Sequence, residues 1–181
     1  KEVYESIGTH EHIRDAILED LRFARRLDFL KHRMGLALAD ELFQVRMYET
    51  VDEFHRGWKR IFIEAANRNI PRLRGHVWRL RFLAVAPLVQ AGAMIVGLLM
   101  LGSDAPLAWS LIALAAASLG VQALGLSQAY RMQGLSPGEI WRFPIGCVRV
   151  ARIFNEAVAD LKHDRGIEWG ARVYKVKSQA E

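Results

Sequence analysis

The sequence predicts a mostly helical membrane protein built around a two-helix transmembrane hairpin at residues 82–130. This stretch contains none of the 25 Lys and Arg residues, and Asp104 is its only acid. Its first segment, residues 82–101, has Gln90 as its only strongly polar side chain, and a helix of that length covers the ~30 Å of hydrocarbon in a bilayer. A five-residue turn leads to a second apolar segment at residues 107–126. A buried hairpin in a soluble bundle is the alternative, because the second segment is rich in alanine.

Basic residues flank the hairpin and are absent from its turn. We call them the basic collar: Arg56, Lys59, Arg60, Arg68, Arg72, Arg74, Arg79 and Arg81 before the hairpin, and Arg131, Arg142, Arg149 and Arg152 after it. The positive-inside rule therefore predicts a multi-pass cell-membrane protein with both chain ends in the cytoplasm. Attraction of the collar to anionic membrane lipids accounts for the net charge of +5 without a nucleic-acid partner.

The rest of the chain divides around this hairpin. Residues 1–50 precede an amphipathic interfacial helix and basic linker at 51–81, and residues 131–181 form a cytoplasmic amphipathic segment and tail. No signal-peptide pattern follows Lys1, and we expect the chain to be part of a longer protein. Its single cysteine, Cys147, cannot form an internal disulfide.

Residues 7–17 are expected to form irregular or short helical structure on the surface. They contain His10 and His12, which would diverge on a helix and are poor metal co-ligands without further groups. Glu19 and Asp20 open the next element, an amphipathic helix predicted to end at Gly35. Since acids in a first turn complement the helix dipole, helix capping is one explanation of this acid pair.

Residues 42–48 alternate between apolar and polar side chains, which predicts a strand, and residues 36–39 precede it. From residue 51 the period becomes helical. The predicted apolar face contains Phe54, Trp58, Ile61, Phe62, Ala65 and Ala66. A basic amphipathic helix before a membrane span is typical of the interface plane, and packing onto a soluble domain is compatible with that. Trp78, Arg79 and Arg81 are predicted interfacial anchors.

Small residues in the second segment predict how the hairpin packs. Ala113, Ala116, Ala117 and Gly120 share one helical face, which would allow the two helices to approach closely. Gln90 and Gln122 could pair across the hairpin or with helices outside this chain. Beyond it, residues 131–138 are predicted to be a polar loop, 141–163 an amphipathic segment and 166–176 a short tail.

Three sets of residues resemble known motifs. The first is Tyr4, Ile7, Gly8, His10, Ile17, Leu18, Glu19, Asp20, Leu21, Ala24 and Arg25; the second is Arg46, Met47, Tyr48, Phe54, Gly57, Trp58 and Lys59; the third is Gly166, Ile167, Glu168, Trp169, Arg172 and Tyr174. In this order they resemble the last catalytic block, the following strand and interface helix, and the terminal motif of bacterial membrane-anchored family 2 glycosyltransferases, such as the carotenoid- and hopanoid-associated enzymes.

The resemblance implies that residues 1–50 are the C-terminal end of a GT-A type α/β catalytic domain and that the membrane hairpin anchors it. The nucleotide-sugar donor and a divalent metal, Mg or Mn, would then be bound by residues upstream of Lys1, and no Asp-x-Asp motif occurs in this sequence. Such a fragment is expected to be inactive alone. Thr9 stands where the family has a second glycine, and the Gln-x-x-Arg-Trp motif of processive members is absent, which favours single transfer to a lipid-linked acceptor.

The resemblance also implies roles for individual residues. Asp20 matches the catalytic base that takes a proton from the acceptor hydroxyl, and Glu19 would orient or cap. His10 and Trp58 are candidates for the acceptor pocket, since an aromatic face at the membrane surface can hold a lipid or sugar ring. Two further hypotheses remain: a non-catalytic adaptor that binds anionic lipid through the basic collar, and a metal-dependent hydrolase that uses His10, His12, Glu19 and Asp20.

Overall fold

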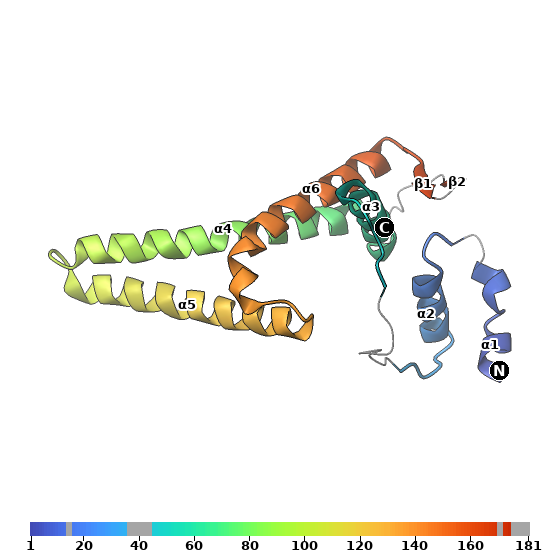
Figure 1. Ribbon diagram of the computed structural model, residues 1–181, viewed down its shortest axis with the longest axis horizontal. Helices are drawn as coiled ribbons and strands as arrows, with labels where there is room; N and C mark the ends of the chain where they lie inside the picture. The colour runs from blue at the N-terminus through green and yellow to red at the C-terminus, as the bar shows by residue number, and fades with distance from the viewer. Residues whose placement is uncertain (14–15, 36–44, 170–171, 175–181) are drawn as a thin grey trace. The chain divides into compact units, whose positions relative to one another are not determined.

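The structure, a computed structural model, describes residues 1–13, 16–35, 45–169 and 172–174 (Figure 1). The described residues are mostly helical, as the sequence predicts. They form two units, one of Lys1–Arg74 with Ile153–Glu181 and the other of Gly75–Arg152.

The first unit begins with three short helical elements. They are α1 (Glu2–Ser6), the 3-10 helix η1 (His10–Ile13) and α2 (Glu19–Phe29). Ile7, Ile13 and Ile17 are buried at the connections between them, so the apolar residues that end each element also form the local core.

The helix α2 is shorter than predicted. The sequence places its end at Gly35, but the helix ends at Phe29. The His32 amide donates to the Leu27 carbonyl at 2.9 Å, and the Lys31 amide donates to the Asp28 carbonyl at 3.0 Å. The Lys31 backbone is left-handed, with φ of +59°. This pair of bonds is the Schellman motif. The predicted Gly35 cap is wrong because backbone bonds end the helix earlier and do not require glycine.

The strand predicted over residues 42–48 is not formed where the structure describes it. Residues 45–48 have no strand partner in the described part of the chain. An alternating pattern supplies an apolar face, but a strand exists only where a neighbour completes its backbone hydrogen bonds. Residues 36–39 and 42–44 lie outside the described residues.

The helix α3 (Val51–Ala65) begins in a capping box. Thr50 Oγ1 accepts the Glu53 amide at 3.1 Å, and Glu53 Oε2 accepts the Thr50 amide at 3.4 Å. Together these bonds satisfy backbone donors that the first turn of a helix leaves open.

The apolar face of α3 packs against the second half of α6 (Phe143–Lys162). Phe62 stacks on Phe154 with ring centroids 4.0 Å apart, and Ile63 is 1% exposed. At the edge of this contact Lys59 pairs with Asp160 at 2.6 Å. The predicted amphipathic helix therefore uses part of its apolar face for packing inside the protein.

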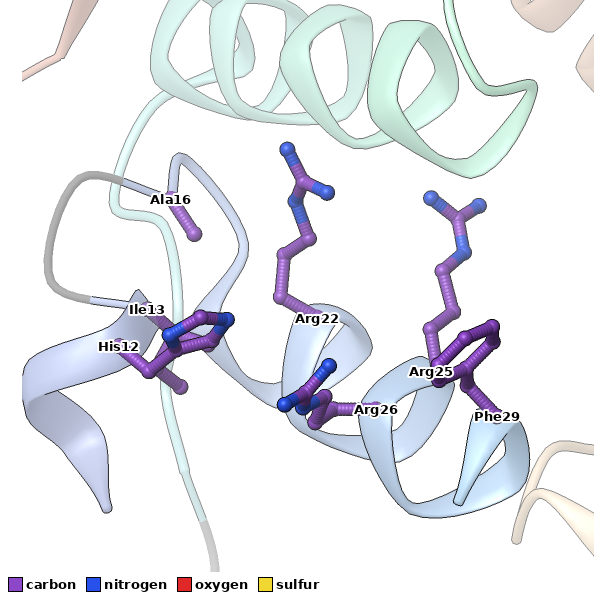
Figure 2. Close-up of a pocket in the computed structure, with 7 residues that line it drawn as sticks. All are labelled: His12, Ile13, Ala16, Arg22, Arg25, Arg26 and Phe29. Atoms are coloured by element: carbon purple, nitrogen blue, oxygen red, sulfur yellow. The ribbon is translucent and has the colours of Figure 1, made fainter. Parts of the chain in front are cut away.

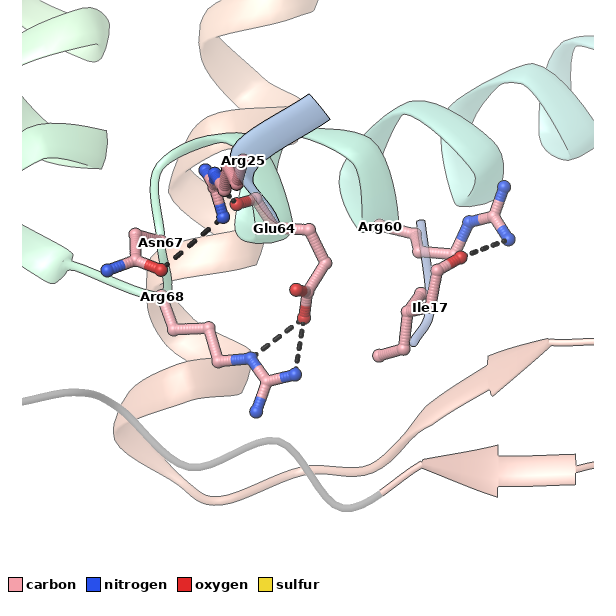
Figure 3. Close-up of polar contacts among 6 residues, drawn as sticks. All are labelled: Ile17, Arg25, Arg60, Glu64, Asn67 and Arg68. Carbon is pink, nitrogen blue, oxygen red and sulfur yellow. Dashed lines mark hydrogen bonds and ion pairs between the residues drawn. The ribbon is translucent and has the colours of Figure 1, made fainter. Parts of the chain in front are cut away.

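Two arginines tie the N-terminal segment to α3 (Figure 3). Arg25 of α2 donates from Nη2 to the carbonyls of Glu64 and Ala65, at 3.2 Å each. Arg60 of α3 donates to the Ile17 carbonyl at 3.4 Å. The last carbonyls of a helix have no partner within it and carry the negative end of its dipole, so the Arg25 guanidinium compensates both.

The first unit ends in a short antiparallel ribbon. It consists of β1 (Ile167–Trp169) and β2 (Arg172–Tyr174), with Glu168 opposite Val173. The predicted tail at 166–176 is therefore partly a hairpin, and residues 170–171 and 175–176 lie outside the described residues.

Two long antiparallel helices dominate the second unit (Figure 1). The helices α4 (Ile70–Met100), which begins in the first unit, and α5 (Ala105–Met132) have 31 and 28 residues, and both are long and apolar enough to cross a membrane. The helix α4 runs without interruption through Pro87. In the turn, Asp104 Oδ1 accepts the Leu107 amide at 3.2 Å and caps α5.

Most apolar side chains of α4 and α5 face outward. In the most apolar 18-residue stretch of each helix, only 11% is buried. Leu99 of α4 and Leu124 of α5 are 79% and 73% exposed. A soluble bundle would cover such a surface. Such a surface also suits the lipid-facing side of helices that are long and apolar enough to cross a membrane.

The two helices meet through a different face of α5 from the one predicted. Ala108 and Ala115 are buried, whereas the predicted face is exposed; its members are Ala113, Ala116, Ala117 and Gly120. The Gln90 amide donates to Ser118 Oγ at 2.8 Å rather than pairing with Gln122. Several faces of an alanine-rich helix can accept a neighbour, so composition alone does not choose between them.

The link from α5 to α6 is the 3-10 helix η3 (Pro137–Arg142). It packs against α5, and Ser136 Oγ caps its start by accepting the Gly138 amide at 3.2 Å. The predicted loop at 131–138 and amphipathic segment at 141–163 thus become the end of α5, η3 and α6.

Gly97→Ala should destabilise the helix pair. A Cβ at Gly97 would lie 2.7 Å from Ile112 Cγ1 and 3.0 Å from the Ala108 carbonyl oxygen, whereas Gly92 has open space around it. We expect Gly97→Ala to lower the free energy of unfolding by about 1–3 kcal/mol. The control Gly92→Ala should leave it unchanged or raise it by up to about 1 kcal/mol. Unfolding in increasing SDS, followed by tryptophan fluorescence, measures both; equal effects would contradict the packing.

Arg25→Met should loosen the N-terminal segment, because it keeps most of the side chain and removes the donors to the end of α3. We expect the free energy of unfolding to fall by about 1–2 kcal/mol. Arg33→Met, at an exposed position outside regular structure, should change it by less than about 0.5 kcal/mol. Hydrogen exchange at residues 17–29 is the second measurement, and unchanged protection there in Arg25→Met would refute the tie.

Candidate functional site

An open pocket of about 930 Å³ lies along one side of α2. We call it the Asp20 pocket. Three of the four predicted site residues line it together, namely His10, Glu19 and Asp20. Much of its remaining wall is apolar or aromatic, from Tyr4, Ile7, Phe23, Ala24 and Leu27. The pocket therefore presents carboxylates beside a surface suited to an apolar or ring-shaped ligand.

The acid pair sits in the first turn of α2, with both side chains exposed. The N-cap residue is Leu18, whose side chain makes no cap bond. Asp20 Oδ1 accepts the Leu21 amide at 2.7 Å, so one oxygen of this carboxylate does stabilise the helix start. Its other oxygen, Oδ2, has no hydrogen-bond partner among the described residues and is available to a ligand.

His10 belongs to an aromatic wall of the Asp20 pocket. Tyr4 Oη lies 2.7 Å from His10 Nδ1 and accepts the His10 backbone amide at 3.2 Å. The Phe23 ring stacks on His10 with centroids 5.2 Å apart and on Tyr4 with centroids 6.0 Å apart. These contacts fix the imidazole plane, and the sequence alone did not indicate Tyr4 or Phe23 as partners.

Trp58 does not line the Asp20 pocket. It lies half-buried on α3, in a row of aromatic rings between Phe54 and Phe62, with centroids 5.8 and 5.2 Å away. Since Phe62 in turn stacks on Phe154, Trp58 continues the packing between α3 and α6. The sequence grouped Trp58 with His10, and the structure does not bring them into one pocket.

A second pocket, of about 370 Å³, lies beside α2 (Figure 2). We call it the arginine pocket; its seven lining residues are His12, Ile13, Ala16, Arg22, Arg25, Arg26 and Phe29. None of these seven is acidic. Sequence analysis missed it, although the spacing of Arg22, Arg25 and Arg26 places them on one side of a helix and away from Phe23 and Leu27.

The described residues do not assemble the metal site of the hydrolase hypothesis. His12 lines the arginine pocket, whereas His10, Glu19 and Asp20 line the Asp20 pocket. In the part of the chain that the structure describes, no three His, Cys, Asp or Glu residues lie close enough to hold a metal ion. These residues therefore do not fit a metal site, and no chemical step is assigned to a metal here.

Two exposed tryptophans in the second unit carry arginines on their rings. The Arg81 guanidinium lies 5.4 Å from the Trp78 ring centroid, and that of Arg142 lies 5.0 Å from the Trp141 ring centroid. Both tryptophans are more than 60% exposed. A ring with a cation beside it suits the headgroup level of a bilayer, where one side of the ring is apolar and the other is wet.

No protein-family model, curated protein or solved structure gives a significant match to this chain. The resemblance to family 2 glycosyltransferases therefore stays a hypothesis that depends on the motifs and on the geometry of the Asp20 pocket.

Proposed function

We propose that this chain is the acceptor-side and membrane-anchoring part of an inverting glycosyltransferase. The observation that carries the proposal is the convergence of His10, Glu19 and Asp20 on one open pocket with an aromatic wall. The motif resemblance assigns the same residues to the acceptor side. The acceptor would be a lipid or another membrane-associated molecule, and the sugar would come from a nucleotide-sugar.

Asp20 Oδ2 is the general base in this proposal. It takes the proton of the acceptor hydroxyl while that oxygen bonds to the anomeric carbon of the sugar, and the bond from that carbon to the nucleotide diphosphate breaks. A single in-line displacement inverts the anomeric centre. The Leu21 amide holds the other carboxylate oxygen at 2.7 Å, so the base is already oriented. Positioning of this kind is one of the main sources of rate in group transfer.

Donor binding is assigned to residues outside this chain. The described residues contain no cluster of three His, Cys, Asp or Glu residues that could hold a metal ion. A GT-A type domain supplies its donor site and its Mg or Mn ligands upstream of the acid pair. Without the donor site and the metal ion that would stabilise the departing diphosphate at the sugar, the 181-residue chain alone is expected to be inactive.

Membrane anchoring is the second part of the proposal. The outward-facing apolar surface of α4 and α5 and the Trp–Arg pairs support two spans with headgroup-level anchors. The basic collar supports cytoplasmic placement of both ends. The same features support the alternative function, an adaptor that binds anionic lipid without catalysis, and that alternative requires nothing of Asp20.

Asp20→Asn, in the complete enzyme, separates the catalytic from the capping explanation. Asp20 lies in the first turn and not at the N-cap, so asparagine keeps an oxygen for the Leu21 amide and loses only the favourable charge at the helix start. The free energy of unfolding should therefore fall by no more than about 1 kcal/mol. Asparagine cannot accept the acceptor proton, so transfer should fall by ~10²-fold or more with donor binding nearly unchanged. Sugar transfer to extracted lipid acceptor, with donor affinity measured separately, tests this. Glu19→Gln is the matched control, with a smaller loss expected; near-normal transfer by folded Asp20→Asn would eliminate Asp20 as the base.

The proposed topology predicts which sites are open to a membrane-impermeant thiol reagent in intact cells. Burial raises the pKa of the Cys147 thiol, which disfavours the reactive thiolate, and Cys147→Ala removes the thiol altogether. In that background, Ser103→Cys should be labelled in intact cells, and Lys162→Cys only after permeabilisation. Labelling at 162 but not at 103 in intact cells would show that the orientation is the opposite of the proposed one. Labelling of neither site after permeabilisation would show that both are covered.

A further inference from the structure

The arginine pocket concentrates positive charge in a small concave site. Its three arginines come from α2 and its histidine from η1, and none of the described residues that line it is acidic (Figure 2). The repulsion between like charges increases as the distance between them falls. Placing these cationic side chains close together therefore costs free energy unless an anion is bound. The basic collar, by contrast, is spread along the chain and can be neutralised by solvent and salt.

The arginines differ in how much of their hydrogen-bonding capacity is already used. Arg25 is committed to the carbonyls at the end of α3, so it adds a fixed charge to the pocket wall. Arg22 is exposed and has no hydrogen bond or ion pair to the residues that the structure describes. Its donors remain open to a ligand.

Arg26 supplies the second observation. Its Nε–H is shielded from solvent and has no hydrogen-bond partner in the described part of the protein, while its guanidinium lies 6.0 Å from the Phe29 ring centroid. A buried donor without a partner loses free energy that a bound acceptor would restore. An oxyanion in the pocket would complete the guanidinium with the planar, two-point geometry that arginine favours.

The composition of the pocket suits a ligand that carries a phosphate group. The pocket volume of about 370 Å³ falls at the small end of the range for ligand sites, ~300–1,000 Å³. Arg22 and Arg26 can each donate two hydrogen bonds, and His12 adds a ring nitrogen on the opposite wall. A carboxylate has two oxygens to satisfy these groups, whereas a phosphate monoester or diphosphate has three or more.

We propose that the arginine pocket is a phosphate-binding site, filled either by the phosphate of an anionic lipid headgroup or by a soluble phosphate or diphosphate. The site lies apart from the residues that line the Asp20 pocket, except that both use α2. The proposal goes beyond the proposed transferase and does not depend on Asp20 being a base.

Binding can be measured on the 181-residue chain in a zwitterionic detergent. Isothermal titration with inorganic pyrophosphate tests a soluble ligand, and titration with dihexanoyl phosphatidic acid tests a lipid headgroup. We expect saturable binding of at least one with one site per chain. Arg26→Gln and Arg22→Gln should each weaken it about tenfold or more, the loss expected when a charged hydrogen bond is removed.

Arg46→Gln is the matched control. It removes the same charge from an exposed position outside both pockets and outside the basic collar, and affinity should stay within about twofold. Binding of pyrophosphate alone identifies a soluble ligand, and binding of the lipid alone identifies a headgroup. The proposal is overturned if neither binds saturably, or if Arg46→Gln weakens binding as much as the pocket variants. Because Arg22 is exposed, Arg22→Gln keeps the test valid if Arg26→Gln fails to fold.

Discussion

The first unit depends on one interaction, the Arg25 guanidinium at the carboxyl end of α3. The Glu64 carbonyl also accepts the Asn67 amide at 2.9 Å, and Arg25 adds a second donor there, a donor to the Ala65 carbonyl and a compensating charge at the helix end. Because Arg25 lies on α2, this bond also sets where α2 sits on α3. The bond from Arg60 to the Ile17 carbonyl and the Phe23 contacts with Tyr4 and His10 add to this contact in placing the candidate site.

The second unit depends on a constraint of a different kind. Only a small part of the apolar surface of its two long helices lies in the contact between them, so most of that surface faces outward. Their mutual contact is narrow and uses small residues, with Gly97 of α4 against Ala108 and Ile112 of α5. In a bilayer, lipid is as apolar as leucine, and close packing of small residues replaces hydrophobic burial as the attraction between helices.

The eleven-residue helix α2 contributes side chains to both the Asp20 pocket and the arginine pocket. One side presents Asp20 to a pocket with an aromatic wall, and another presents arginines to a basic pocket. A helix of 3.6 residues per turn separates such groups in space although they are adjacent in sequence. An acceptor hydroxyl and a phosphate could therefore be recognised by one short element without competing for the same side chains.

The sequence by itself determined the helical class, the two apolar helices with the turn between them, and the acid pair at the start of α2. These follow from local composition and period, which act within a few turns. The structure decided the rest: the early end of α2, the absence of a strand at residues 45–48, the face on which α5 meets α4, and the separation of Trp58 from His10. The early end of α2 follows from backbone bonds in its own last turn, whereas the other three depend on partners distant in the chain. A strand needs a neighbouring strand, a contact between helices needs an opposing surface, and a pocket needs two walls. No local sequence pattern specifies which distant residues provide them.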